Sequence, residues 1–410
     1  MGRPSRSRNC PLEADRRSLM DAYALQRSWD RVTRHGEQVP LYFYSHLFVS
    51  HPEVRSMFPL SMANQRDKLV SALGRIVSNA DRIENDADFL RHLGRDHRKY
   101  AVVAEHYNAV GASLCATLKH FLGSEWDEEL AADWTAAYQV IARIMVEAAE
   151  TASETSPDWW DAEVVSVERR TMDLTLLTVR PGRAFHFRPG QSVSMEIPQR
   201  PRQWRYFSPA NAPRRDGSID LHVQQIDGGQ VSTAVVRSLK VGDTVKLGAP
   251  VGERLTRQAD DPSDLLMVAG GTGLAPLRAV LEEIDQEWQR SRTAPRVHLL
   301  HGVRMPWHLY DRPWLRELAQ RRPWFEYTEV VSDDPSYPGT RGKVGKVAAR
   351  QALYGRTAMV CGGPQMVGHT LEQLTAAGMH PERIKYEHFY YAAADQHTAE
   401  AALTRSGDNR

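Results

Sequence analysis

The sequence predicts a multidomain protein with an all-α part, an antiparallel β-barrel and a doubly wound α/β part, in that order. Three changes of pattern along the 410 residues predict this architecture. Apolar residues at helical spacing come first, short alternating segments between turns follow, and strands alternating with helices come last. We place the three parts at 18–153, 154–258 and 259–391, with loose polar tails at 1–17 and 392–410.

In the all-α part, two segments carry apolar residues three and four positions apart. This spacing puts one apolar stripe on each of two helices. The stripes are Tyr107, Val110, Leu114, Leu118 and Phe121, and Leu130, Trp134, Tyr138, Ile141 and Met145.

In the second part, short segments alternate apolar and polar residues, as in Leu174–Leu176 and Ile219–Val223. The turn clusters RPGR, RPGQ, RRDG and DGG separate them. Short alternating strands at this spacing predict an antiparallel barrel.

The third part alternates buried-type strands with helices. The strands are DLLMVAG, VHLLHGV and AMVCGG, and the helices follow in LRAVLEEI, WLRELAQ and HTLEQLTAAG. This alternation predicts a parallel, doubly wound sheet.

Composition excludes several classes of protein. Fifty-two basic and 51 acidic residues give a net charge of +1, so we expect no nucleic-acid or membrane-surface partner. The three cysteines, Cys10, Cys115 and Cys361, lie too far apart for zinc spacing and are too few for an iron–sulfur cluster. With no apolar run of membrane-spanning length and no disulfide framework, a cytoplasmic protein is expected.

A glycine-rich turn joins the first strand of the α/β part to its helix. It runs from Gly270 to Pro276 as GGTGLAP. Glycines let backbone amides approach a pyrophosphate, and the following helix directs its positive end at that anion. Taken alone, such a segment is a tight turn as often as a nucleotide site.

Five motifs in order make the nucleotide assignment specific. They are R-x-x-S at Arg205–Ser208, G-x-V-S at Gly229–Ser232, the glycine-rich turn, CGGP at Cys361–Pro364, and Glu387–Phe389. In this order they resemble the ferredoxin–NADP reductase superfamily over residues 158–390.

The resemblance implies FAD on the barrel and NAD(P)H on the α/β part. It implies that Arg205 and Ser232 hold the FAD phosphates and that Ser208 lies near the flavin, with Phe207, Gly229 and Val231 in the same motifs. Gly271, Thr272 and Gly273 would cradle the nicotinamide nucleotide, Cys361, Gly362 and Pro364 would lie beside the nicotinamide, and Glu387 and Phe389 would lie near the isoalloxazine. A surface charge at Arg205, a buried strand end at Cys361 and a core residue at Phe389 are the alternative readings.

Two segments of the all-α part carry specific motifs. LGRDHRKYAVVAEHY is similar to the segment of the flavohaemoglobin globin domain that carries the proximal histidine, which implies His97 as the ligand of haem iron, with Tyr107 ten residues later. The departures given below resemble a divergent actinobacterial-type branch of this family. YFYSHLFVSHPEVRSMF is similar to the distal side and implies Tyr44 as the distal tyrosine and Phe58 against the haem. Gln65 and Leu69, four apart on one helix face, complete the distal set. A plain helical core is the alternative for Tyr44, Phe58 and Leu69.

Four positions depart from the resemblance. Ser192 and Phe207 stand where tyrosines usually contact FAD. Ala149 stands where a glutamate usually bonds to the proximal imidazole, and Asp96 replaces a common lysine. Losing that carboxylate makes the imidazole less basic and the bound ligand less polarised for O–O chemistry.

The resemblance therefore implies an NAD(P)H-dependent oxidoreductase that uses haem b, FAD and NAD(P)H. It implies nitric oxide dioxygenase activity with O2, NO and NAD(P)H as small-molecule partners. A flavohaem oxidoreductase with another donor or substrate, such as a hydroxy acid or a peroxide, and an oxygen or NO sensor are the alternatives. The choice between NADH and NADPH stays open, because an isolated Arg304 after VHLLHGV is weak support for a 2′-phosphate site.

Overall fold

A computed structural model describes residues 21–78, 87–258, 261 and 263–388. The chain divides into two compact units, Met1–Ser156 and Pro157–Arg410. Both predicted polar tails, 1–17 and 392–410, and Phe389 lie outside the described residues.

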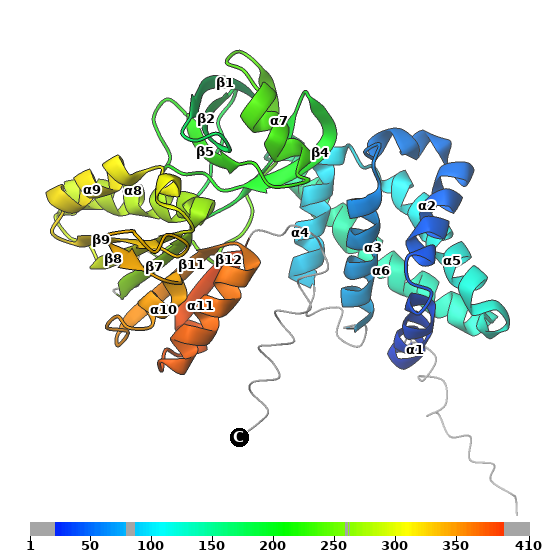
Figure 1. Cartoon of the computed structure of the whole chain (residues 1–410). Coiled ribbons are helices and arrows are strands. Elements are labelled where there is room, and N and C mark those ends of the chain that lie inside the picture. The colour runs from blue at the N-terminus through cyan, green and yellow to red at the C-terminus, as the bar shows by residue number, and fades with distance from the viewer. Residues whose placement is uncertain (1–20, 79–86, 259–260, 262, 389–410) are drawn as a thin grey trace, which may run out of the picture. The chain divides into compact units, whose positions relative to one another are not determined.

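The first unit is helical, as predicted (Figure 1). Its α-helices are α1 (Ala22–Thr33), α2 (Gln38–Ser50), α3 (Ala63–Ser78), α4 (Ala87–His97), α5 (Ala104–Leu122) and α6 (Glu128–Ser153). The two predicted apolar stripes lie on α5 and α6, where Leu114, Leu118, Trp134 and Ile141 are buried. Asp127 caps α6 by accepting a hydrogen bond from the Leu130 amide, which satisfies one of the free amides of the first turn.

A glycine lets α4 approach α6 closely. A Cβ atom added at Gly94 would lie 2.2 Å from the backbone oxygen of Met145. Any larger residue there would push the two helices apart, because the obstacle is backbone rather than a flexible side chain. Gly94 lies three residues before His97, so the same contact fixes how closely the end of α4 lies to α6.

The second unit begins with a curled antiparallel sheet. Its strands, in chain order, are β1 (Trp160–Arg169), β2 (Leu174–Pro181), β3 (Val193–Ile197), β4 (Arg200–Phe207), β5 (Ile219–Gln224) and β6 (Thr244–Leu247). The order across the sheet is β4-β3-β6-β1-β2-β5. A bridge between Pro209, just after β4, and Leu221 of β5 joins the two edges, so the sheet approaches the predicted barrel.

Alternation places one face of this sheet in the core. On β1, Trp160, Ala162 and Val164 are buried while Asp161 and Glu163 are exposed. Helix α7 (Gln230–Ser238) packs Val231 and Val235 into the same core. The sequence pattern did not predict α7, because its four buried residues fall within a short segment that also carries the G-x-V-S motif.

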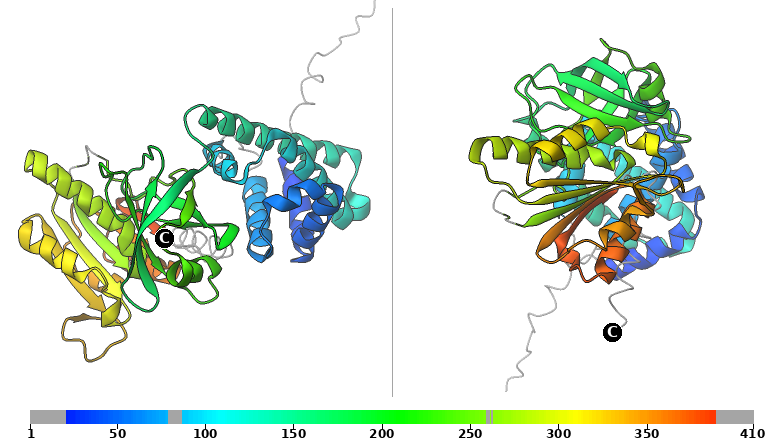
Figure 2. Two further views of the ribbon diagram at one scale, coloured as in Figure 1. Left: turned by 90° about the horizontal axis from the view of Figure 1, so that it is seen from above. Right: turned by 60° about the vertical axis from the view of Figure 1, so that its left-hand side comes forward.

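The rest of the second unit is a parallel sheet between two layers of helices, as predicted. Its strands are β7 (Asp264–Gly270), β8 (Val297–Val303), β9 (Phe325–Val331), β10 (Thr340–Arg341), β11 (Arg356–Gly362) and β12 (Ile384–His388). Its helices are α8 (Leu274–Ser291), α9 (Arg312–Arg321), α10 (Val344–Ala348) and α11 (Pro364–Ala376). Helices α8 and α9 cover one face of the sheet and α10 and α11 the other (Figures 1 and 2).

The strand order in this sheet is β10-β9-β8-β7-β11-β12, and every neighbouring pair is parallel. The chain runs outward from β7 to β10 and then returns to place β11 on the other side of β7. The strand order therefore reverses between β7 and β11, and ligands of such sheets bind outside the carboxyl ends of the strands at this point.

No helix in the described part of the chain is both long and apolar enough to cross a bilayer.

Candidate functional site

His97 is the last residue of α4, at the position that the sequence assigns to an iron ligand. Its Nδ1 lies 2.7 Å from the backbone oxygen of Leu93. A carbonyl only accepts hydrogen bonds, so Nδ1 carries the proton and Nε2 keeps the lone pair that binds a metal. Burial lowers the pKa of His97 and favours this neutral form. The residue present therefore fits the proximal ligand of a haem.

The carboxylates near His97 are engaged elsewhere or exposed. Asp96 accepts a hydrogen bond from the buried Lys99 ammonium at 2.6 Å. Burial lowers the pKa of Lys99 and the Asp96 charge opposes that shift. Glu147 and Glu150 on α6 are exposed. The imidazole of His97 thus bonds to a peptide carbonyl, the partner of lower charge.

On the distal side, Tyr44 lies within an aromatic cluster. Its ring centroid is 5.6 Å from that of Phe58 and 5.8 Å from that of Phe48, and Tyr44 is only 5 % exposed. The Tyr44 hydroxyl donates to the backbone oxygen of Gln65 at 3.3 Å. Burial raises the pKa of Tyr44, so the hydroxyl stays protonated and remains a donor.

That hydrogen bond is long for a hydroxyl donor, whose usual distance is about 2.7–2.8 Å. The Tyr44 proton can therefore turn toward a better acceptor on the distal side. The structure brings Tyr44, Phe58 and Gln65 together. Tyr44 lies on α2, Phe58 follows the 3-10 turn Pro52–Met57, and Gln65 lies on α3.

Leu69 of α3 packs in the same apolar cluster and borders a small cavity. The cavity lies among α1, α2, α3 and α5, and its lining is apolar. Its wall consists of Trp29, Val39, Pro40, Phe43, Leu69, Val70, Leu73, Leu114, Thr117 and Leu118. Tyr44 and Leu69 thus lie in one apolar cluster, the surroundings that a haem face requires.

Tyr107 lies on α5 in a separate apolar cluster with residues of α4 and α6, among them Leu93 and Met145. Its backbone oxygen accepts the Tyr138 hydroxyl at 2.7 Å. Burial raises the pKa of Tyr107. The structure thus places Tyr107 beside the helix that carries His97.

In the second unit, the expected flavin residues come from two elements. Arg205 and Phe207 lie on β4 and Ser208 follows it, while Gly229 caps α7, whose first turn contains Val231 and Ser232. The Ser232 hydroxyl accepts from the Ile226 amide at 3.3 Å and donates to the Gly229 oxygen at 3.4 Å. This pair of bonds holds the loop before α7, whose N-terminal amides are groups that can bind an anion. Val231 is 1 % exposed and belongs to the barrel core.

The hydroxyl of Ser192, one of the departures, links two residues of the expected flavin site. Its Oγ lies 3.3 Å from that of Ser208, and it also bonds to the carboxyl group of Glu387 on β12. Ser192, at a position where a tyrosine is usual, thus forms a polar link between the barrel and the parallel sheet. Sequence reasoning treated this position only as a loss, since nothing in the RPGQSV segment indicates a partner almost 200 residues away.

The glycine-rich turn lies at the reversal of strand order. Gly271 has a φ of +53°, which favours glycine. A Cβ atom on Gly273 would lie 2.1 Å from the backbone oxygen of Cys361. The backbones of β7's turn and β11 therefore touch, and the amides of Gly271–Gly273 begin α8, as in a pyrophosphate cradle.

Three further residues of this motif set lie on the other side of the reversal. Cys361 is fully buried at the end of β11, and burial raises the pKa of its thiol, with the Glu387 charge adding to the shift. Gly362 packs its α-carbon against the side chain of Met366, and Pro364 begins α11. The structure thus places Cys361 and Glu387 on paired strands at one end of the sheet.

His301 is a site residue that the sequence reasoning missed. It is buried on β8, and its Nε2 lies 3.0 Å from the backbone oxygen of Gly271. Burial lowers the pKa of His301 to about 4, so the ring is neutral and Nε2 donates. His301 therefore orients the carbonyl of the glycine-rich turn. Its place directly before a glycine at a strand's carboxyl end, in LLHGV, was the available signal.

Glu387 gives the site a titrating group near neutral pH. Burial raises its pKa from 4.5 to about 7, while Arg254 and the hydrogen bond from Ser192 oppose the shift. The folded protein binds this proton more tightly than the unfolded chain, so stability falls as pH rises from about 4.5 through about 7.

Glu387→Gln is expected to remove that fall in stability, because the amide cannot ionise. We expect the melting temperature of the variant, relative to that of the unmodified chain, to rise between pH 5 and pH 8 (about the range in which the native group titrates). Glu163→Gln, on the exposed face of β1, is the control and should leave the difference flat. Equal pH dependence in Glu387→Gln and the unmodified chain would contradict the assignment.

Comparison with known proteins agrees with this organisation. The family model described as Globin matches residues 41–145, the Oxidoreductase FAD-binding domain matches 161–255, and the Oxidoreductase NAD-binding domain matches 267–372. The chain is 27 % identical over 390 residues to a flavohemoprotein of Rhizobium meliloti (strain 1021), covering 87 % of this chain and 94 % of that one.

Two further proteins define the limits of the likeness. The chain is 32 % identical over 224 residues to the reductase component of phenol 2-monooxygenase from Pseudomonas sp. (strain CF600), covering 53 % of this chain and 62 % of that protein's length. A flavohemoglobin structure from Malassezia yamatoensis superposes with a TM-score of 0.75, covering 91 % of this chain and 99 % of that one at 18 % identity, and shows the shared fold.

A globin fold followed by FAD- and NAD-binding folds defines an NAD(P)H-dependent flavohaem oxidoreductase. Its cofactors are haem, FAD and NAD(P)H. The chain belongs to the flavohaemoglobin family.

Proposed function

We propose that this flavohaemoglobin is a nitric oxide dioxygenase that consumes NAD(P)H and O2 and converts NO to nitrate. The observation that carries the proposal is the buried Tyr44 hydroxyl, held over Gln65 among apolar side chains. When bound, the flavin and haem would turn a hydride into single electrons and bind a diatomic gas.

The chain's own residues would act at three places. His97 presents Nε2 to the metal and keeps its other nitrogen on Leu93. Tyr44 supplies a donor whose strength grows where apolar walls exclude water, so it stabilises negative charge that develops on a small ligand. Gln65 accepts the hydroxyl through its backbone oxygen, and its side-chain amide would serve as a second donor to the ligand.

At the flavin end, hydroxyl groups and one carboxyl group form a chain. Ser208 bonds to Ser192, and Ser192 bonds to Glu387. A group with a pKa of about 7 can hold and release a proton at neutral pH, so Glu387 is suited to exchange protons with the hydroxyl of Ser192.

The surroundings of His97 favour chemistry on dioxygen over the reduction of a peroxide, which is the alternative substrate. A carboxylate partner makes a ligating imidazole more basic and assists O–O cleavage, whereas His97 bonds to a peptide carbonyl. NADH oxidation driven by peroxide, at a rate equal to that driven by NO and O2, would support the alternative.

Tyr44→Phe is expected to slow NO consumption, because it removes the hydroxyl donor and keeps the ring. We expect a loss of about 10- to 100-fold, somewhat below the roughly 10²–10³ measured for donors that stabilise a developing oxyanion. Adding Gln65→Leu should lower the rate further. The assay follows NO with an electrode in the presence of NADH and O2.

Tyr42→Phe is the matched control. Tyr42 lies on the same helix and stacks on His120 at 4.1 Å, outside the Tyr44 cluster. Its loss of a hydroxyl should leave NO consumption within about twofold, as for surface substitutions. Unchanged NO consumption in the Tyr44→Phe, Gln65→Leu double variant would refute the role of the distal pocket.

A further inference from the structure

The carboxyl ends of β7, β8 and β9 form a continuous edge beside the glycine-rich turn. Gly270 pairs with Gly302, and Val303 pairs with Val331. The pairing continues past the strands, because the Asp333 amide donates to the Arg304 oxygen at 2.9 Å. Arg304 and Asp333 therefore lie together, one strand and two strands away from the turn.

The direction of a bound dinucleotide along this edge follows from the contacts of the barrel. Glu387 on β12 bonds to Ser192, and its Oε1 would lie 2.8 Å from a Cβ atom on Gly252. Ser192, which lies 3.3 Å from Ser208 of the expected flavin site, is therefore on the β11–β12 side of β7. The nicotinamide must reach that side to meet the flavin. With the pyrophosphate on Gly271–Gly273, the adenosine extends the other way, over β8 and β9.

At the adenosine end, Arg304, the cation that the sequence suggested for a 2′-phosphate, is already paired. Arg304 Nε donates to Asp333 Oδ2 at 2.8 Å. Asp333 also accepts the Ser332 hydroxyl through Oδ1 at 2.6 Å. These two hydrogen bonds, Ser332 first and Arg304 second, lower the pKa of Asp333, so it is charged at neutral pH.

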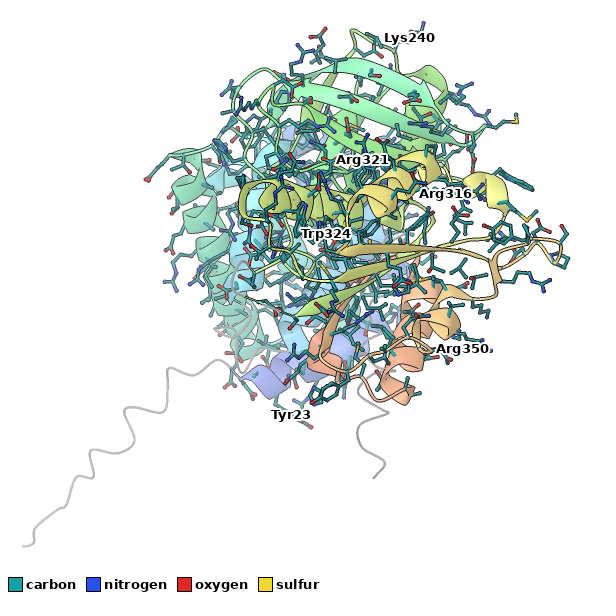
Figure 3. The ribbon with its side chains drawn as sticks, turned by 90° about the vertical axis from the view of Figure 1, so that its left-hand side faces the viewer. Tyr23, Lys240, Arg316, Arg321, Trp324 and Arg350 are labelled. Atoms are coloured by element: carbon teal, nitrogen blue, oxygen red, sulfur yellow. The ribbon has the colours of Figure 1, made fainter. Side chains whose placement is uncertain are left out.

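Neighbouring arginines are paired as well. Arg312 and Arg316 of α9 both bind Glu329 of β9, at 3.0 and 2.9 Å (Figure 3 shows Arg316 on α9). Asp334 follows Asp333 and holds the amide and hydroxyl of Ser336. Arg304, Arg312 and Arg316 thus each have a carboxylate partner, and Arg341 of β10 donates to the backbone oxygen of Pro335. The edge beyond β9 begins with two carboxylates.

A ribose 2′-hydroxyl and a 2′-phosphate place opposite demands on such an edge. The hydroxyl is a neutral donor, and an acidic residue accepts its proton in NAD sites. The phosphate carries about −1.5 to −2 charges at neutral pH and needs an arginine that is not neutralised. Asp333 can accept a hydrogen bond from the ribose 2′-hydroxyl. It disfavours a 2′-phosphate, because its own charge repels the phosphate and because it pairs with Arg304.

We propose that this flavohaemoglobin selects NADH over NADPH, and that Asp333, which pairs with Arg304, is the residue that determines the selection. The proposal concerns the nucleotide that supplies electrons and does not depend on NO being the substrate. Asp333 acts on the adenosine ribose, at the opposite end of the nucleotide from the hydride.

Anaerobic bleaching of the flavin in the holoprotein, by NADH and by NADPH in separate mixtures, tests the selection without any NO chemistry. We expect the apparent second-order rate constant for NADH to exceed that for NADPH by about tenfold or more, the effect of roughly one misplaced charge. Equal rates, or faster bleaching by NADPH, would overturn the proposal.

Asp333→Asn tests the residue, since it keeps the shape and removes the charge. We expect the NADH to NADPH ratio to fall about tenfold, mainly through faster bleaching by NADPH. Asp333→Arg should lower the ratio further. Asp334→Asn is the matched control for general charge and should change the ratio less than about twofold. Equal effects of Asp333→Asn and Asp334→Asn would contradict a specific role for Asp333.

Calorimetric titration with 5′-AMP and with adenosine 2′,5′-bisphosphate measures the same preference without turnover. The unmodified holoprotein should bind 5′-AMP more tightly, and Asp333→Asn should gain affinity for the bisphosphate alone. A gain for both ligands would mean that the substitution acts on the site as a whole.

Discussion

Replacing His97 with alanine is expected to abolish electron delivery to haem while flavin reduction by NADH continues. His97 alone presents a neutral imidazole at the end of α4, with Nδ1 fixed on Leu93 and Nε2 available. Losing a residue that merely orients a metal ligand costs about 10- to 100-fold, so losing the ligand itself should lower NO consumption by more than about 100-fold.

An anaerobic visible spectrum under CO, before and after NADH, separates the two halves of this result. In His97→Ala the flavin band should bleach at the unmodified rate, and the Soret band should be absent or fail to shift. His92→Ala is the control, because His92 lies on the same helix five residues earlier. A normal Soret shift in His97→Ala would exclude His97 as the proximal ligand.

Gly273→Ala should produce the converse defect. The added methyl group would meet the backbone oxygen of Cys361 at 2.1 Å and its carbonyl carbon at 2.5 Å. Neither atom belongs to a flexible side chain, so the glycine-rich turn must move away from β11. Overpacking of this kind typically costs about 1–3 kcal/mol of stability. We also expect a fall of more than about 100-fold in flavin bleaching by NADH, since misplacing a binding group by about 1 Å can cost 10²-fold.

Gly368→Ala, inside α11 and outside the CGGP motif, provides a matched control. A Cβ atom there meets nothing within 4 Å, and alanine suits a helix interior. This variant should bleach like the unmodified chain. The Soret band of Gly273→Ala reports whether the globin unit has folded, and the retained flavin band reports whether the FAD part has folded. Rapid bleaching by NADH in Gly273→Ala would show that the turn does not bind the nucleotide.

The order of folds was predictable because each part repeats its own period. Stripes such as Leu114–Leu118 specify a helix, and the alternation around Ile219 specifies a half-buried strand. Short elements were not predicted. Helix α7 and strand β12 owe their conformation to the barrel and to β11, against which they pack. Tertiary packing decides such segments, so their local pattern is uninformative.

The sequence assigned only those site residues that lie within recognisable motifs. Resemblance assigned Tyr44, Gln65 and His97, and the structure brings the first two together. The partners of these groups stayed hidden, because they depend on which elements meet. His301 bonds to Gly271 and Ser192 bonds to Glu387 across sequence separations that no local pattern records. Arg304 shows the same limit, since its neutralising partner lies on the next strand.

The peptide carbonyl behind His97 has a consequence for electron flow. An imidazole that donates to a carboxylate takes on negative charge and stabilises the oxidised metal, whereas one that donates to Leu93 does so less. Less charge on His97 would raise the reduction potential of a bound haem iron. Electron transfer from flavin to haem would then run further downhill than with a carboxylate partner behind His97.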